Sequence, residues 1–146
     1  MRELTDVSNI SHAIQLAVAP VFLLTAIGAM LGVMTNRLAR VIDRARTLEA
    51  RLVGATPGDA PGLMRHLGIL SRRAKFINLA ITLCTMTALL VCTVIAILFL
   101  GAFISFDLTI PLSLLFIAAM CMLVLGLVLF LREIFLATAS LRIGSH

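Results

Sequence analysis

Apolar residues dominate three long stretches of the chain. They run from about 10 to 34, from 79 to 100 and from 111 to 131. Each stretch is as long as the helix of about 20 residues that crosses the hydrocarbon core of a bilayer. A helix is the expected conformation there, because lipid offers no hydrogen-bonding partners to an open backbone. The pattern predicts an all-α integral membrane protein with three transmembrane helices in a single membrane domain, 1–146.

The connection between the first two stretches, 35–78, has a helical pattern of its own. Apolar residues alternate at spacings of three and four in a first seam, which consists of Leu38, Val41, Ala45, Leu48 and Leu52. A second seam consists of Leu63, Leu67, Leu70, Ala74, Ile77 and Ile81. Such seams are typical of packed helices. Three glycines and two prolines between 54 and 62 predict a turn. We therefore expect helices 1 and 2 to extend into an antiparallel helical hairpin.

Charge is scarce overall and concentrated in this connection. The chain is 61% hydrophobic and only 13% charged, whereas soluble domains have about 25% charged residues. Nine of the twelve basic residues lie in 35–78, and the connection 101–110 has none. Because basic loops remain on the cytoplasmic side, the hairpin is predicted to be cytoplasmic, the N-terminus outside and the C-terminus inside.

Eight of these nine basic residues are candidates for contact with anionic lipid or with a cytoplasmic protein partner. They are Arg37, Arg40, Arg44, Arg46, Arg51, Arg72, Arg73 and Lys75. The net charge of +5 could also suggest nucleic acid, but no aromatic residues are interleaved with the arginines to stack on bases. We expect no nucleic-acid partner.

Catalytic and metal-binding motifs are missing from the sequence. Cys84, Cys92 and Cys121 lie in apolar stretches without a CxxC pattern, which is typical of buried small hydrophobes. No nucleophile elbow, phosphate-binding loop or zinc-protease motif is present. We expect no enzyme activity, no metal and no cofactor.

Polar residues within or beside the three stretches form a candidate functional face. They are His12, Gln15, Thr25, Asn36, Asn78, Thr82 and Thr85. Such residues either hydrogen-bond between helices or line an aqueous path, although threonine also bonds to its own helix. Gly28 and Gly32 form a GxxxG pattern, which favours close helix packing. After the third stretch, the segment 132–146 is predicted to be amphipathic and to lie along the inner membrane surface.

Two segments resemble a known family. The segment from Ile10 to Glu49, ISHAIQLAVAPVFLLTAIGAMLGVMTNRLARVIDRARTLE, and the later LFLREIFLATASLRI are similar to bacterial membrane proteins grouped as domain of unknown function 2721. The resemblance covers nearly the whole chain. It implies a small protein of the bacterial inner membrane, and it implies no activity.

Two hypotheses for the function follow. The first is a homo-oligomeric scaffold or regulatory protein, whose basic hairpin contacts anionic lipid or a partner. The alternative is a homo-oligomeric ion channel lined by the polar faces of helices 1 or 2. Both need self-association, because three helices of modest polarity leave the seams with a second side to bury.

Overall fold

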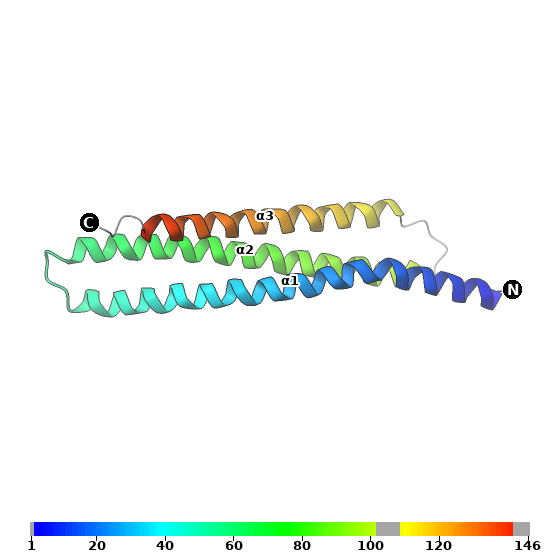
Figure 1. Cartoon of the computed structure of the whole chain (residues 1–146), viewed down its shortest axis with the longest axis horizontal. Helices are drawn as coiled ribbons and strands as arrows, with labels where there is room; N and C mark the ends of the chain where they lie inside the picture. Colours follow the sequence, from blue (N-terminus) through cyan, green and yellow to red (C-terminus); the bar gives the residue numbers. More distant parts are fainter. Residues whose placement is uncertain (1, 102–108, 142–146) are drawn as a thin grey trace. The chain divides into compact units, whose positions relative to one another are not determined.

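The computed structural model describes residues 2–101 and 109–141 and consists of three long helices (Figure 1). Helix α1 spans Arg2–Val53, α2 spans Ala60–Gly101 and α3 spans Thr109–Leu141. The described residues contain no strand. All three helices are long and apolar enough to cross a membrane, which is the all-α membrane architecture that the hydrophobic pattern predicts.

The helices are longer than the apolar stretches that they contain. Helix α1 has 52 residues and continues through Pro20, whereas about 20 residues are enough to cross the hydrocarbon core. Helix α3 continues without a break from the third stretch to Leu141, so most of the segment predicted to lie along the membrane surface belongs to this helix. The last residues of that predicted segment, 142–146, lie outside the described residues. Residues 102–108 of the predicted outer connection also lie outside them.

A short turn joins α1 to α2. The hydroxyl of Thr56 donates a hydrogen bond of 2.7 Å to the Asp59 carboxylate. The amide of Leu63 donates to the Asp59 carbonyl at 3.2 Å and so begins the next helix. Pro61 lies in the first turn of α2, where a missing amide proton costs no helical hydrogen bond. The turn is therefore shorter than the predicted 54–62.

The chain divides into two compact units, and each contains part of all three helices. Unit 1 combines Met1–Leu31 with Leu83–Val124, and unit 2 combines Gly32–Thr82 with Leu125–His146. The interior of unit 1 is made largely of small side chains. Its buried residues include Ala13, Ala17, Ile27, Cys84, Thr87, Val91, Val94 and Ala119. Small residues allow helix backbones to approach closely, which is the usual basis of packing in membranes.

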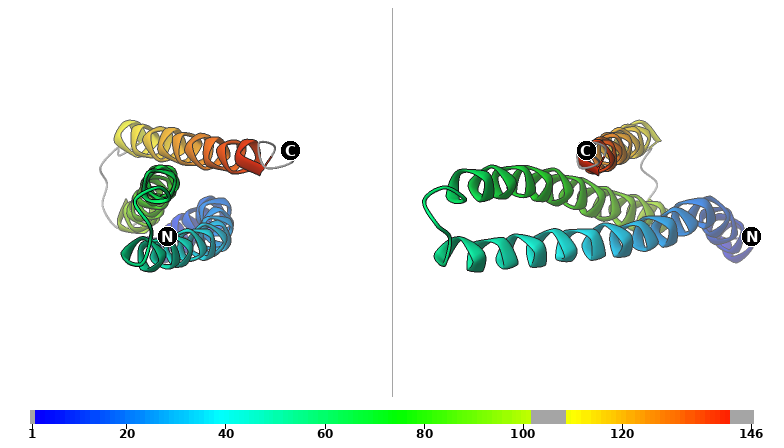
Figure 2. Two further views of the ribbon diagram at one scale, coloured as in Figure 1. Left: turned by 90° about the vertical axis from the view of Figure 1, so that its left-hand side faces the viewer. Right: turned by 60° about the vertical axis from the view of Figure 1, so that its left-hand side comes forward.

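The interior of unit 2 contains the predicted seams. Every residue of the first seam is buried or half-buried, with Val41 the least exposed, and the same holds for the second seam, with Leu70 and Ile77 buried. Figure 1 and the right view of Figure 2 show this part of α1 and of α2 running side by side from the turn. Phe130 and Glu133 add the contribution of α3 to the interior.

Large apolar side chains remain exposed along all three helices. Phe22 on α1 is 72% exposed, Leu89 on α2 is 58% exposed and Ile110 on α3 is 75% exposed. A soluble protein rarely leaves so much apolar surface in water. Such surfaces are expected where helices face hydrocarbon.

Candidate functional site

Glu133 is a buried acid in the most apolar helix of the protein. Its side chain has no exposed surface. One carboxylate oxygen, Oε2, accepts a hydrogen bond of 3.1 Å from Nη1 of Arg37. The other, Oε1, accepts bonds of 3.1 Å and 2.8 Å from Nε and Nη2 of Arg73. One carboxylate thus joins all three helices of unit 2, and we call these three residues the ion triad.

Helical spacing places each member of the ion triad. On α3, Glu133 follows the buried Phe130 by three residues and so continues the buried stripe. On α1, Arg37 lies three residues after the buried Met34. On α2, Arg73 lies three residues after the buried Leu70 and flanks the second seam. Glu133 therefore occupies a position of the buried stripe, whereas Arg37 and Arg73 flank the seam residues Leu38 and Ala74.

The ion triad satisfies the hydrogen-bonding requirement of the buried carboxylate. An isolated charge in an apolar interior costs many kcal/mol, and an ion pair offsets that cost only with good geometry and further hydrogen bonds. Both oxygens of Glu133 are bonded, and no buried side-chain polar atom among the described residues lacks a partner. Arg37 also lies over the ring of Phe130, with 5.7 Å from its guanidinium carbon to the ring centroid. The ion triad thus holds the helices of unit 2 in one arrangement.

A small cavity of about 160 Å³ adjoins the ion triad. We call it the arginine pocket. It is lined by Arg37, Arg40, Val41, Arg44, Leu70, Arg73 and Glu133. Four arginines and one glutamate give the lining a formal charge of +3. Arg40 and Arg44 are exposed, and neither has an ion pair with a described residue.

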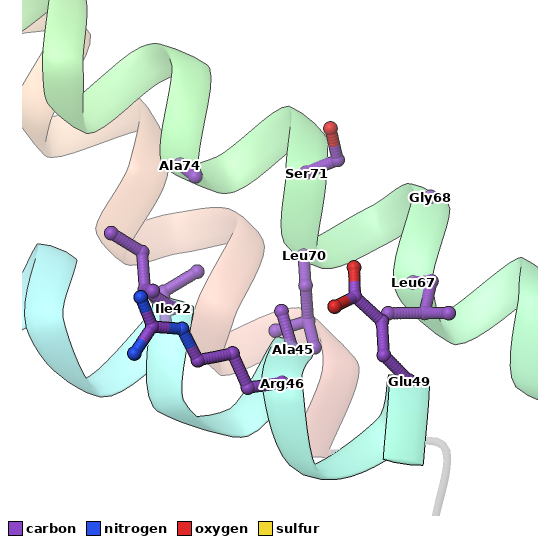
Figure 3. Close-up of a pocket in the computed structure, with 10 residues that line it drawn as sticks. Ile42, Ala45, Arg46, Glu49, Leu67, Gly68, Leu70, Ser71 and Ala74 are labelled. Atoms are coloured by element: carbon purple, nitrogen blue, oxygen red, sulfur yellow. The ribbon is translucent and has the colours of Figure 1, made fainter. Parts of the chain in front are cut away.

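A larger groove of about 510 Å³ lies between α1 and α2 in unit 2. Figure 3 shows its lining, with Ile42, Ala45, Arg46 and Glu49 from α1. Leu67, Gly68, Leu70, Ser71 and Ala74 come from α2. The groove is mostly apolar, with one basic and one acidic side chain on the α1 side.

The predicted polar face is distributed over both units and is exposed throughout. His12, Gln15, Thr25 and Thr85 belong to unit 1, and Asn36, Asn78 and Thr82 to unit 2. The hydroxyl of Thr25 donates to the Val21 carbonyl at 3.3 Å, and that of Thr82 donates to the Asn78 carbonyl at 2.9 Å. These two threonines bond to their own helices, so their hydroxyl protons are already engaged.

The buried hydroxyl of unit 1 is a different threonine, Thr87. It donates to the Leu83 carbonyl of its own helix at 2.9 Å and lies 3.4 Å from the Ala119 carbonyl on α3. Its side chain has no exposed surface. The predicted polar face does not include Thr87. Its spacing of three residues from Cys84, on the interior face of α2, is the signal that could have identified it.

The glycine pair has no close neighbour among the described residues. A Cβ added to Gly28 or Gly32 would meet no atom within 4 Å. Both glycines are exposed. The face that they form on α1 is therefore open for contact with another molecule.

The basic residues of the hairpin fall into two groups. Arg37 and Arg73 are bonded to Glu133, with side chains 36% and 18% exposed. The other six predicted candidates form the exposed group: Arg40, Arg44, Arg46, Arg51, Arg72 and Lys75. Arg65 of the hairpin is exposed as well. Within the exposed group, Arg72 lies over the ring of Phe76 at 5.8 Å from the centroid. The described residues contain no group of three or more His, Cys, Asp or Glu side chains that could hold a metal ion.

Comparison with known proteins gives one finding. The profile of a family described as Protein of unknown function (DUF2721) matches residues 17–143. No curated protein and no solved structure matches the chain. The matched segment includes α1 from residue 17 onward, all of α2 and α3, and the whole ion triad. The chain belongs to the DUF2721 family of proteins of unknown function.

Proposed function

We propose that this protein is a non-catalytic, homo-oligomeric scaffold or regulatory protein of the bacterial inner membrane. In this proposal the hairpin formed by α1 and α2 lies in the cytoplasm, with the N-terminus outside and the C-terminus inside. The exposed basic group of the hairpin contacts anionic lipid or a cytoplasmic protein partner.

The division of the basic residues carries the proposal. Two arginines are used to neutralise Glu133, and the exposed group of six remains on the hairpin together with the exposed Arg65. Basic residues near a membrane are each attracted to an anionic surface by about 1 kcal/mol. A cluster of six would therefore hold the hairpin against the anionic leaflet or against an acidic partner.

Self-association is supported by polar and small residues on otherwise apolar helices. Asn36 and Asn78 are exposed, as are Gly28 and Gly32. In lipid, exposed amides and glycine faces are favoured contacts between helices. A second copy of the chain supplies such contacts.

Cysteine crosslinking tests self-association. In a protein with Cys92 and Cys121 replaced by alanine, Gly28→Cys is compared with Ala26→Cys, which is also exposed but points to another side of α1. Oxidation of native membranes is expected to give a covalent dimer with Gly28→Cys and little with Ala26→Cys. Monomer from both variants, and from cysteines placed elsewhere along α1, would contradict the homo-oligomer.

Lipid analysis tests the role of the hairpin. The exposed basic residues are replaced together by glutamine, while Arg37 and Arg73 are kept. Mass spectrometry of lipids retained by the purified protein is expected to show several-fold less anionic lipid, and pull-downs are expected to lose any partner of the hairpin. Unchanged lipid and partner content would count against the proposal.

An ion channel is the second candidate. It is favoured by the exposure of Asn36 and Asn78, whose amides are available to an aqueous path between copies. Conductance measurements on bilayers with purified protein test this. Conductance that the substitution Asn78→Leu abolishes would support the channel. Bilayers without any conductance would contradict the channel and favour the scaffold.

A further inference from the structure

The arginine pocket has the chemistry of an anion site. Arg37, Arg40 and Arg44 recur at spacings of three and four along α1 and therefore project from one side of the helix. Arg73 lines the same cavity from α2. Arginine at the (i, i+4) spacing repels its like-charged neighbour by a few tenths of a kcal/mol, and a bound anion would relieve that repulsion.

The ion triad fixes part of the pocket in advance. Glu133 engages Nη1 of Arg37 and the Nε and Nη2 of Arg73, so both guanidinium groups are held in place. A guanidinium has five N–H donors, so both retain donors that Glu133 does not use. Arg40 and Arg44 have no ion pairs with described residues, so all of their N–H donors remain available to an anion. Pre-ordered arginines bind tetrahedral oxyanions well because less freedom is lost when the anion arrives.

The size of the cavity fits a single oxyanion. A cavity of about 160 Å³ has room for about five water molecules at about 30 Å³ each. This volume is sufficient for one phosphate group. Val41 and Leu70 provide apolar walls, which strengthen charge interactions by lowering the local dielectric constant.

The place of the pocket in the sequence favours a membrane surface. Arg37 lies three residues after the predicted end of the first apolar stretch at Met34, which is about 4.5 Å along a helix. Headgroup layers extend about 5–8 Å beyond the hydrocarbon on each side. If the hairpin is cytoplasmic, as in the proposed function on which this inference rests, the arginine pocket lies at the level of the inner headgroups.

We propose that the arginine pocket binds one phosphate group, with Arg40 and Arg44 closing on the anion and the ion triad forming the base of the site. The phosphate comes from the headgroup of an anionic phospholipid or from a free phosphate compound. The two sources share the same recognition chemistry, and the experiment separates them.

Isothermal titration calorimetry on the full-length protein in neutral detergent is the test. The ligands are inorganic phosphate, short-chain phosphatidic acid, short-chain phosphatidylglycerol and, as a neutral control, short-chain phosphatidylcholine. Arg40→Gln/Arg44→Gln removes two pocket charges without touching the ion triad. Arg46→Gln/Arg51→Gln removes the same charge from exposed positions of the same helix that do not line the pocket.

The expected result is saturable binding with a stoichiometry of one. The pocket variant should weaken it by about tenfold or more, the equivalent of about 1.4 kcal/mol, and the control variant by less than about threefold. Binding of lipids but not of inorganic phosphate assigns the site to a headgroup, and binding of both assigns it to phosphate in general. No saturable binding, or equal weakening in the two variants, overturns the proposal.

This outcome is separable from the fate of the proposed function. If the sixfold replacement releases anionic lipid while the two double variants behave alike, the basic hairpin functions without the pocket. If crosslinking finds only monomer while the pocket variant loses phosphate, the pocket exists without the scaffold.

Discussion

The two units of the protein pack their helices around interiors of different chemistry. Among its described residues, unit 1 buries mostly small apolar side chains and one hydroxyl, that of Thr87, which bonds mainly to its own helix. Unit 2 buries a carboxylate, Glu133, which bonds to side chains of the two other helices. Close packing therefore determines the arrangement of unit 1, whereas charge pairing adds a specific fixed point to unit 2. The two interiors should respond differently to changes of volume and of charge.

Removal of the buried acid should have the largest effect. Glu133→Ala leaves Arg37 and Arg73 without their counter-charge, and breaking a buried pair in this way costs about 3 kcal/mol. Helix content followed by circular dichroism during thermal unfolding in detergent measures the loss. This signal is suitable because the chain contains no Trp or Tyr for fluorescence.

The control for this change is Glu49→Ala, which removes an exposed acid and should shift stability by less than about 0.5 kcal/mol. Equal loss of stability in both variants would mean that the ion triad does not hold unit 2. Arg73→Gln should destabilise more than Arg37→Gln, because Arg73 makes two hydrogen bonds to Glu133 and is less exposed.

Overpacking should affect unit 1. Ala119 is fully buried on α3, so Ala119→Leu forces the helices of this unit apart at a cost of about 2 kcal/mol. Ala118→Leu is the matched control. Ala118 is adjacent to Ala119 but exposed, so it should accept the larger side chain without loss of stability. The same unfolding measurement compares them, and tolerance of leucine at both positions would show that unit 1 is not closely packed.

Loss of the buried hydroxyl should have the smallest effect. Thr87→Val keeps the shape of the side chain and removes its hydrogen bonds, for which membrane proteins give an average of about 0.6 kcal/mol. Thr93→Val is the control, since Thr93 is exposed and bonds to the Leu89 carbonyl of its own helix at 2.9 Å. A loss as large as that of Glu133→Ala would remove the distinction between the units.

The sequence predicts the helices better than the site. Long apolar stretches and seams such as Leu38 and Val41 are local patterns, so the three helices and the interior face of the hairpin can be read directly from them. The ion triad depends on residues 60 and 96 positions apart, and no local pattern connects such residues. Glu133 is also adjacent to Arg132 in the sequence, which makes it resemble an ordinary charge at the end of a membrane helix.

Helical spacing predicts which polar residues share a face, but it does not determine whether that face is buried. Thr82 and Thr87 are only five positions apart in the sequence, yet Thr82 is exposed and Thr87 is fully buried. Thr87 belongs to the stripe of buried residues on α2 that includes Cys84 and Val91, whereas Thr82 lies outside this stripe. Comparing each polar position with the register of its apolar neighbours would have favoured Thr87 and Glu133.

The order of synthesis gives the ion triad a consequence for biogenesis. A ribosome makes Arg37 first, then Arg73, and delivers Glu133 only after most of the chain has entered the membrane. Until then the two arginines lack the carboxylate that pairs with both of them in the complete chain, and we expect their like charges to repel. Arrival of the third helix neutralises that repulsion, so insertion of the last segment completes the assembly of the first two.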